Sequence, residues 1–315
     1  MNQTDQFDSN GRISIMNFDD GRYFRTISEN LYSIPLRIED MKKTKVDFQF
    51  LSTVPIFFSY WAKGEDTEIV ARYLNDYSAN IVNQYSEKFA GLGTVPMQSP
   101  ELAIREMKRC KYELKFKGLE IGTHVNDKPL DDIKFEPFWA EVEKHQMPIF
   151  IHPWDVTKAN ERWNRFWMPH IVGMTAETTA CALGLALSGV LERYPRLKIC
   201  FAHGGGTLPY IRGRVQQAFK YYPKDMQIKT KLEPEIFLSN NPNITCDTIT
   251  HNPEALKLAL KFYGEDSVLL GSDYPFLLGE HVPGELVTRI QNIKPEIKQK
   301  ILAKNSLRFF DYLPN

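Results

Sequence analysis

The sequence lacks an excess of either charge, and this excludes a large group of partners. Its 315 residues contain 39 Lys and Arg against 39 Asp and Glu, so the formal net charge is zero. A chain that is drawn to nucleic acid or to an anionic membrane by its overall charge carries a clear positive balance. We therefore expect no nucleic-acid partner and no membrane partner.

The sequence also has few cysteines, and its first residues lack the pattern of a secretion signal. No two of the cysteines form a CxxC pair, so we interpret them as reduced core residues of an intracellular protein. The N-terminal residues are polar, without the basic and then apolar pattern of a signal peptide. The apolar run Ala180–Val190 is too short to span a bilayer. These features predict a cytosolic protein. The cysteines are Cys110, Cys181, Cys200 and Cys246.

Several common catalytic motifs are absent. The sequence has no P-loop, no GxGxxG fingerprint and no serine-centred nucleophile elbow, so nothing supports phosphate binding, dinucleotide binding or acyl transfer. It also has no repeat and no interior linker. We predict a disordered tail at residues 1–10, then a single domain over 11–315. That domain opens with a small β insertion at 11–34, where Asp20-Gly21 indicates a hairpin between two short strands.

What the sequence does have is a regular alternation of strands and helices. Each predicted strand precedes a helix, which favours parallel βαβ units. A doubly wound sheet remains possible, but polar residues at the ends of three strands fit the mouth of a (β/α)8 TIM barrel better. The helix predicted at 36–44 has no strand before it, so the first strand of the barrel is missing. The seven strands are predicted at 46–54, 89–95, 118–122, 148–152, 197–203, 243–247 and 267–273.

The three polar strand ends are His152, His203 and Asp273. Two imidazoles and a carboxylate suit Zn²⁺, and zinc lowers the pKa of a bound water to about 7. A nearby histidine such as His203 is able to carry the proton. Taken singly, each residue has an ordinary interpretation, because a lone histidine is usually a core residue and Asp273 precedes a turn. The other histidines (His124, His145, His170, His251 and His281) we assign to loops or to the surface.

Longer motifs carry a specific resemblance. They resemble the aminocarboxymuconate-semialdehyde decarboxylases, a family of the amidohydrolase superfamily, from about residue 19 to the C-terminus. The resemblance implies a distorted (β/α)8 barrel of the metal-dependent hydrolase type with a small inserted β-piece. It implies zinc-dependent, non-oxidative decarboxylation in tryptophan degradation. The motifs are Leu51–Pro55, Phe58–Lys63, Gly91–Thr94, Gly122–Asn126, His152–Asp155, Phe201–Gly206 and Gly271–Pro275.

The resemblance also implies roles for single residues. Zinc is held in this family by an HxH pair on the first strand, and by residues matching His152 and Asp273. His203 matches the acid/base. Two arginines hold the carboxylates of the substrate, one matching Arg25 and the other, Arg214, reaching in from the partner subunit. A homodimer and a small dicarboxylate semialdehyde substrate are therefore expected.

Two departures stand out. No histidine precedes His124, so the HxH pair is absent together with the missing strand, and the zinc site is expected to be incomplete. We expect a longer form that carries HxH. His170 stands where the family has a tryptophan. Three hypotheses follow: the family's decarboxylase, which diverts carbon from quinolinate and NAD synthesis; a hydrolase of the same superfamily; or a catalytically impaired isoform that pairs with a full-length subunit.

Overall fold

The computed structural model describes residues 2–8, 11–17, 21, 23–156 and 165–312. Within it the chain divides into two compact units. The first comprises residues 1–48 and 272–283, and the second comprises residues 49–271 and 284–315. The expectation of a single domain over 11–315 stays a prediction.

The first unit contains a three-stranded antiparallel sheet in the order β1-β2-β3. β1 (Asn2–Asp8) pairs with β2 (Gly11–Asn17) along its whole length, although its polar composition had indicated a disordered tail. Backbone pairing, which needs no apolar side chains, accounts for the difference. β2 also pairs with β3 (Tyr23–Ser28), as the predicted hairpin requires, but residues 18–20 of its turn lie outside the described residues. The unit continues with η1 (Glu29–Leu31) and α1 (Ile34–Thr44).

A polar cluster joins α1 to the segment 272–283 within this unit. The hydroxyl of Tyr274 donates to Asp40 at 2.7 Å, and the amide of Asn30 donates to the same oxygen at 3.2 Å. The guanidinium of Arg37 lies 4.7 Å from the centroid of the Tyr274 ring. Burial lowers the pKa of Arg37 and raises the pKa of Tyr274. The segment that carries Asp273 is therefore tied to α1 next to that residue.

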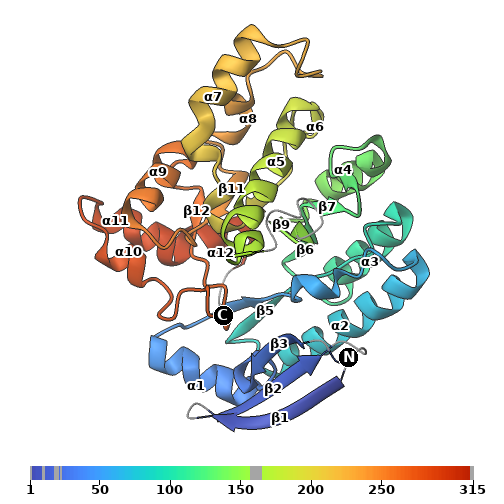
Figure 1. The fold of residues 1–315 in the computed structure, drawn as a ribbon, viewed down its shortest axis with the longest axis vertical. Coiled ribbons are helices and arrows are strands. Elements are labelled where there is room, and N and C mark those ends of the chain that lie inside the picture. Colours follow the sequence, from blue (N-terminus) through green and yellow to red (C-terminus); the bar gives the residue numbers. More distant parts are fainter. Residues whose placement is uncertain (1, 9–10, 18–20, 22, 157–164, 313–315) are drawn as a thin grey trace. The chain divides into compact units, whose positions relative to one another are not determined.

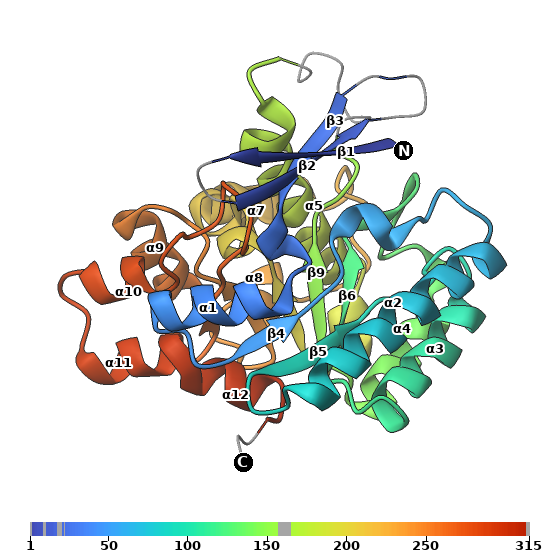
Figure 2. The ribbon, with the colours of Figure 1, turned by 90° about the horizontal axis from the view of Figure 1, so that it is seen from below.

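The second unit contains a curled parallel sheet of seven strands in the order β12-β11-β10-β9-β6-β5-β4 (Figures 1 and 2). All seven predicted strands are present: β6 has the predicted bounds, and the other six are shorter than predicted. They are β4 (Gln49–Leu51), β5 (Phe89–Gly93), β6 (Gly118–Gly122), β9 (Ile149–His152), β10 (Ile199–Phe201), β11 (Ile244–Asp247) and β12 (Val268–Leu269).

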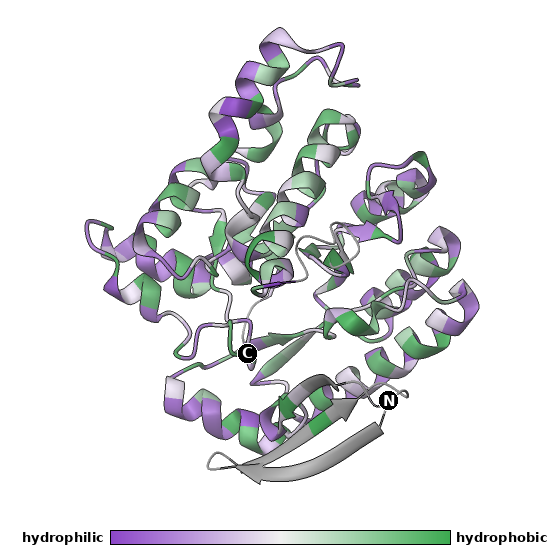
Figure 3. Cartoon of the chain, viewed as in Figure 1, coloured by the Kyte–Doolittle hydropathy of each residue, from purple (hydrophilic) through white to green (hydrophobic). Residues whose placement is uncertain are grey.

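Helices cover the outside of this sheet, and Figure 3 shows hydrophilic and hydrophobic residues alternating along them, as amphipathic helices require. They are α2 (Gly64–Gln84), α3 (Pro100–Tyr112), α4 (Glu136–His145), α5 (Met174–Leu187), α6 (Val190–Arg193), α7 (Leu208–Tyr221), α8 (Pro234–Leu238), α9 (Pro253–Tyr263), α10 (Glu285–Arg289), α11 (Pro295–Gln299) and α12 (Asn305–Phe309). Shorter elements are η2 (Pro55–Phe58), β7 (His124–Val125), β8 (Lys128–Pro129), η3 (Ile133–Phe135), η6 (Pro169–Gly173), η7 (His203–Gly205) and η8 (Lys300–Lys304).

The alternation of side chains along the strands separates two apolar layers. On β9, Ile149 and Ile151 are fully buried in the main core beneath the helices. Phe150 packs against a second, inner cluster that includes Leu92 and Cys200 from other strands. Because successive side chains of a strand point to opposite faces, His152 lies on the same inner face as Phe150. The parallel sheet with its outer helices is a distorted (β/α)8 barrel.

The barrel is open on one side within the described residues. β12 and β4 are the two edges of the sheet, and no ladder joins them. β4 is the first strand of this sheet along the chain, so an earlier strand between β4 and β12 would close it. The structure therefore agrees with the sequence in lacking the first barrel strand among the residues described.

The helical run Pro169–Leu187, made of η6 and α5, is 19 residues long and apolar enough to cross a membrane by length and composition. The apolar run noted in the sequence, Ala180–Val190, is shorter and begins later than this helical run. In this unit Thr178, Ala182 and Leu185 of α5 are fully buried. A buried core helix passes the same test as a membrane span, so the absence of a membrane partner stays a prediction. α5 ends at Leu187, and Gly189 adopts φ 79° before α6 begins.

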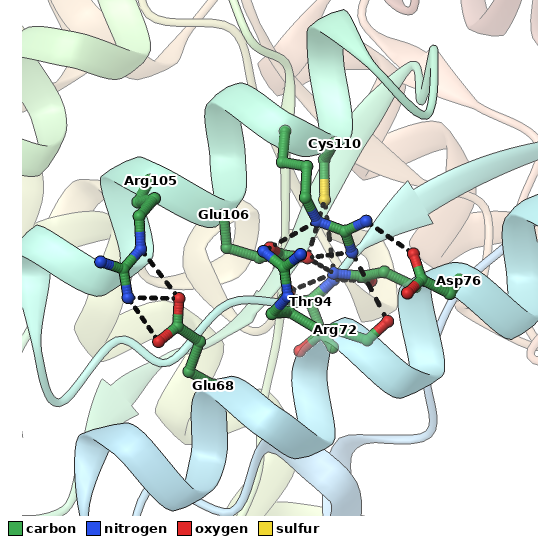
Figure 4. Close-up of polar contacts among 9 residues, drawn as sticks. Glu68, Arg72, Asp76, Thr94, Arg105, Glu106 and Cys110 are labelled. Atoms are coloured by element: carbon green, nitrogen blue, oxygen red, sulfur yellow. Dashed lines mark hydrogen bonds and ion pairs between the residues drawn. The ribbon is translucent and has the colours of Figure 1, made fainter.

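A buried carboxylate joins α2 to α3 (Figure 4). Glu106 is fully buried and accepts hydrogen bonds from Arg109 at 2.7 and 2.8 Å and from Asn75 at 2.7 Å. Asn75 also bonds the backbone of Thr94 in both directions at 2.9 Å. The hydrogen bonds to Glu106 raise the pKa of Arg109. This network fixes both helices to the end of β5.

We predict that Glu106→Ala lowers the free energy of unfolding by about 3 kcal/mol, because it leaves buried donors without their acceptor. The matched control is Glu68→Ala on the same helix pair, which removes an ion pair to Arg105, whose side chain is 61% exposed. Exposed pairs contribute about 1 kcal/mol or less. Urea unfolding of both variants measures the difference, and equal losses would contradict the assignment.

Candidate active site

Two histidines meet at the carboxyl ends of neighbouring strands. His152 is the last residue of β9, and His203 follows β10 by two residues. The strands pair in parallel, with Phe201 opposite Ile151, so their ends lie side by side. The two imidazole rings are 4.9 Å apart between centroids and meet edge to face at 74°. The structure thus brings together two of the three residues predicted for the metal and proton-transfer site.

The surroundings of His152 hold its imidazole in the neutral form. Its Nδ1 lies 2.8 Å from the carbonyl oxygen of Pro153, which can only accept, so Nδ1 carries the proton. Burial, and then the nearby charge of His203, lower the pKa of His152 to about 3. The Nε2 lone pair is therefore available at neutral pH, and a neutral imidazole nitrogen is the form that binds a metal.

His203 is also neutral, but its backbone is unusual. Its φ is 55°, in the left-handed region, and three glycines with positive φ follow. Burial, and then the charge of His251, lower the pKa of His203 to about 4. Its Nδ1 is buried and has no hydrogen-bond partner among the described residues. An imidazole with this pKa is neutral at pH 7, so one of its ring nitrogens keeps an unprotonated lone pair.

A third polar strand end, Asp247 on β11, was missed in the sequence. Its buried carboxylate accepts backbone N–H groups from His203 at 3.0 Å, Gly204 at 2.8 Å and Ile249 at 3.0 Å. Burial raises its pKa, while these hydrogen bonds act in the opposite direction. The signal was present in the sequence, since Asp247 ends a predicted strand just as His152 does.

An aromatic group lies at the end of β6, and it too was missed. The hydroxyl of Tyr60 accepts the backbone N–H of Gly122 at 3.2 Å, and the Tyr60 ring meets Trp154 edge to face at 5.1 Å. Trp154 donates from its indole nitrogen to the carbonyl of His124 at 2.7 Å and stacks on the His124 ring. His124 is therefore part of a half-buried aromatic cluster rather than a free surface histidine.

The remaining predicted site residues lie on α7 and in the first unit. Arg214 is exposed on α7, and no described contact joins it to His152 or His203. Asp273 belongs to the first unit, where its φ is 52° and its carbonyl accepts the N–H of Phe276 at 2.9 Å. Arg25 is also in the first unit, on β3 with its backbone paired to Met16, and its side chain lies outside the described residues. The roles of these three residues stay predictions.

The donor set fits a divalent metal only in part. His152 and His203 are neutral imidazoles with adjacent edges, which is the donor chemistry that zinc and related ions select. No group of three or more His, Cys, Asp or Glu side chains is gathered into a metal site within the described part of the chain. His152 is the better ligand of the two, because its Nδ1 is satisfied by Pro153 and its Nε2 is free to bind.

Comparison with known proteins identifies the family. A family model described as amidohydrolase matches residues 28–312. The chain belongs to the amidohydrolase family. It is 40% identical over 296 residues to a 2-amino-3-carboxymuconate-6-semialdehyde decarboxylase from Dictyostelium discoideum, covering 94% of this chain and 81% of the relative. It is 33% identical over 341 residues to the enzyme of that name from Caenorhabditis elegans, covering 93% and 84%.

Solved structures agree with this assignment. A 5-carboxyvanillate decarboxylase from Sphingomonas paucimobilis superposes with a TM-score of 0.81 at 27% identity, covering 88% of this amidohydrolase and 83% of that chain. A dihydroxybenzoic acid decarboxylase from Polaromonas, solved with bound manganese, has a TM-score of 0.79 at 26% identity, covering 89% and 86%. The barrel prediction is confirmed, this amidohydrolase is a carboxy-lyase, and a divalent metal is plausible for it.

We predict that the metal-free amidohydrolase loses stability as the pH falls from about 6.5 to about 4. The folded pKa values of His152 and His203 lie below the ordinary value, so the unfolded chain binds more protons in this window. Each histidine contributes a slope of at most about 1.4 kcal/mol per pH unit. The contribution is absent above about pH 6.5, where both states are neutral.

Thermal unfolding in the presence of a chelator, from pH 7 to pH 4, measures this slope. The double variant His152→Gln, His203→Gln should have a shallower slope than the parent, whereas His281→Gln, at an exposed position, should not. The comparison between variants removes the opposing effect of Asp247, whose raised pKa adds stability as the pH falls. Identical slopes in the parent and the double variant would refute the prediction.

Proposed function

We propose that this amidohydrolase removes carbon dioxide from 2-amino-3-carboxymuconate 6-semialdehyde without oxidation, with zinc as its metal. This reaction belongs to the kynurenine pathway of tryptophan degradation and limits quinolinate and NAD synthesis. The observation that carries the proposal is the pair of neutral imidazoles at the strand ends, with ring centroids 4.9 Å apart. It is supported by the 40% identity to a relative named 2-amino-3-carboxymuconate-6-semialdehyde decarboxylase. The predicted cytosolic location is part of the proposal.

The polar residues of the proposed site would bind either the metal or the substrate carboxylates. His152 and Asp273 would hold the metal, together with an HxH pair that a longer form would supply. A bound zinc ion polarises substrate oxygens and lowers the pKa of water. Arg25 and the partner subunit's Arg214 would bind the substrate carboxylates, since guanidinium groups match carboxylates with two parallel hydrogen bonds. This pair of arginines favours a multiply carboxylated substrate over an amide or a lactone.

His203 would act as the general acid/base. Its pKa of about 4 keeps the imidazole neutral at pH 7, so it is able to take up a proton. Loss of carbon dioxide leaves an electron pair on carbon, and the same imidazole, once protonated, would return a proton there. Its burial keeps bulk water from competing for that proton. The aromatic cluster of Tyr60 and Trp154 would add an apolar surface near β6.

A homodimer is the proposed assembly, and α7 is the helix that favours it. Only Leu208 and Pro209 are buried among its 14 residues. Tyr210 is 82% exposed, one turn before the exposed Arg214. A helix with this much uncovered surface is able to present Arg214 to a second subunit. The catalytically impaired isoform is the second candidate function, because the described sheet is open and HxH is absent.

We predict that the 315-residue chain binds well under one zinc per subunit and has little decarboxylase activity, because catalytic zinc sites need three protein ligands or more. With an HxH strand added ahead of β4, both should rise. Elemental analysis and loss of the semialdehyde chromophore measure them. Equimolar zinc with turnover in the unextended chain would refute the incomplete-site interpretation, and faster turnover of amides or lactones would assign a hydrolase instead.

In the extended form, substitutions of His203 and His152 should have different effects on zinc content and on rate. His203→Gln should keep zinc and lose about 10²- to 10⁴-fold in rate, as expected for a general acid/base. His152→Gln should lose zinc as well as rate. The control is His281→Gln, at an exposed position, which should change neither. Zinc loss in His203→Gln would make this residue a metal ligand and not the proton carrier.

We also predict that the unextended chain rescues an extended Arg214→Ala subunit when the two are co-expressed. The mixed dimer would contain one complete metal site served by Arg214 of the unextended chain. The control is co-expression with an unextended chain that itself carries Arg214→Ala. Co-purification without recovered rate would leave the unextended chain as a non-productive subunit.

A further inference from the structure

The loop after β10 has a backbone conformation that most residues avoid. His203 has a φ of 55°, and Gly204, Gly205 and Gly206 follow with φ of 64°, 73° and 69°. For a residue with a side chain, the left-handed region costs about 1 kcal/mol or more. Glycine adopts it freely, but His203 does not. Some interaction must therefore hold His203 in place.

Packing restrains the glycines but gives no hydrogen bond to His203. A Cβ atom on Gly204 would lie 2.5 Å from Cγ2 of Thr250, and one on Gly205 would overlap the hydroxyl of Tyr263. These neighbours come from the segment before α9 and from α9 itself. The loop is thus closely packed, and only glycine fits at both positions.

The hydrogen bonds that hold this loop are accepted by the carboxylate of Asp247. One carboxylate oxygen accepts the N–H of His203 at 3.0 Å, and the other accepts the N–H of Gly204 at 2.8 Å and of Ile249 at 3.0 Å. β11 pairs with β10, with Cys246 opposite Phe201, so Asp247 lies beside the end of β10. Hydrogen bonds from N–H groups to a carboxylate are among the strong ones.

Among the described residues, no side chain forms a hydrogen bond with Nδ1 of His203. This buried atom has no other hydrogen-bond partner there either, whereas catalytic histidines are usually oriented by a group bonded to it. The direction of the ring towards His152 therefore depends on the backbone of His203. That backbone is held by Asp247.

We propose that Asp247 is the positioning residue of His203, whose carboxylate fixes the His203 and Gly204 amides and so aims the imidazole at His152. It acts through the backbone and does not touch the reacting atoms. The structural part of this inference stands alone, and its effect on rate rests on the proposed function.

Hydrogen exchange at single amides tests the inference. The chain has seven histidines, so histidine-selective ¹⁵N labelling gives seven backbone signals, and His203→Gln assigns one of them. In the parent chain the His203 amide should exchange slowly. In Asp247→Asn it should exchange at least about tenfold faster, because an amide group is a weaker acceptor and can present a donor to the N–H. The other six should change little.

The matched control is Thr245→Val on the same strand. Thr245 is fully buried and donates to the carbonyl of Ile199 at 3.3 Å, without contact to His203. Its loss should not change exchange at His203. Parallel changes in all seven amides of Asp247→Asn would indicate general loosening and overturn the proposal. Fast exchange of the His203 amide in the parent chain would overturn it too, and this needs no folded variant.

Kinetics separate this inference from the proposed function. In a form that decarboxylates, Asp247→Asn should lower kcat by about 10- to 100-fold and leave KM within about twofold, because it misplaces a proton carrier without removing a substrate contact. Faster exchange at His203 without decarboxylation by any form would refute the proposed function and support the positioning role. Unchanged exchange and an unchanged kcat would refute the positioning role alone.

Discussion

The period-two alternation of the parallel strands is the constraint on which the rest of the second unit depends. It sends Ile149 and Ile151 outwards into the helix layer and turns Phe150 and His152 inwards. A shift of one residue in register would exchange these sets and bury the imidazole among apolar side chains. Packing in the core therefore fixes the direction in which His152 points.

Two buried carboxylates are stabilised in different ways, with different consequences. Glu106 is neutralised by guanidinium charge from Arg109 and helps to join two helices. Within the described part of the chain, Asp247 receives only backbone N–H groups, from its own loop and from the segment after β10. Glu106 pairs with Arg109 on its own helix and accepts a hydrogen bond from Asn75 on α2, so it stabilises the packing of two helices. A carboxylate bonded to backbone amides instead fixes the conformation of the chain. The second arrangement is the one found beside the two histidines.

The sequence predicts what depends on local pattern and misses what depends on neighbours. Apolar runs ending in breaks located all seven parallel strands, and the polar residues at two strand ends located His152 and His203. β1 was missed because its stability comes from backbone pairing that polar side chains do not reveal. Asp247 was missed although it ends a predicted strand, because its hydrogen bonds to the His203 and Gly204 amides depend on the neighbouring β10.

In the proposed function, the open side of the barrel and the incomplete donor set would have one cause. The sheet ends at β4 and β12. The resemblance to the decarboxylase family implies that the strand closing this sheet would carry the HxH pair. Within the described residues, the same region lacks both a ladder of backbone hydrogen bonds and the nitrogen ligands that would join His152. Strand ends in a closed barrel converge on one mouth, so a single added strand would supply the ladder and the ligands together. Under the proposed function, closure of the sheet and completion of the metal site would therefore occur together.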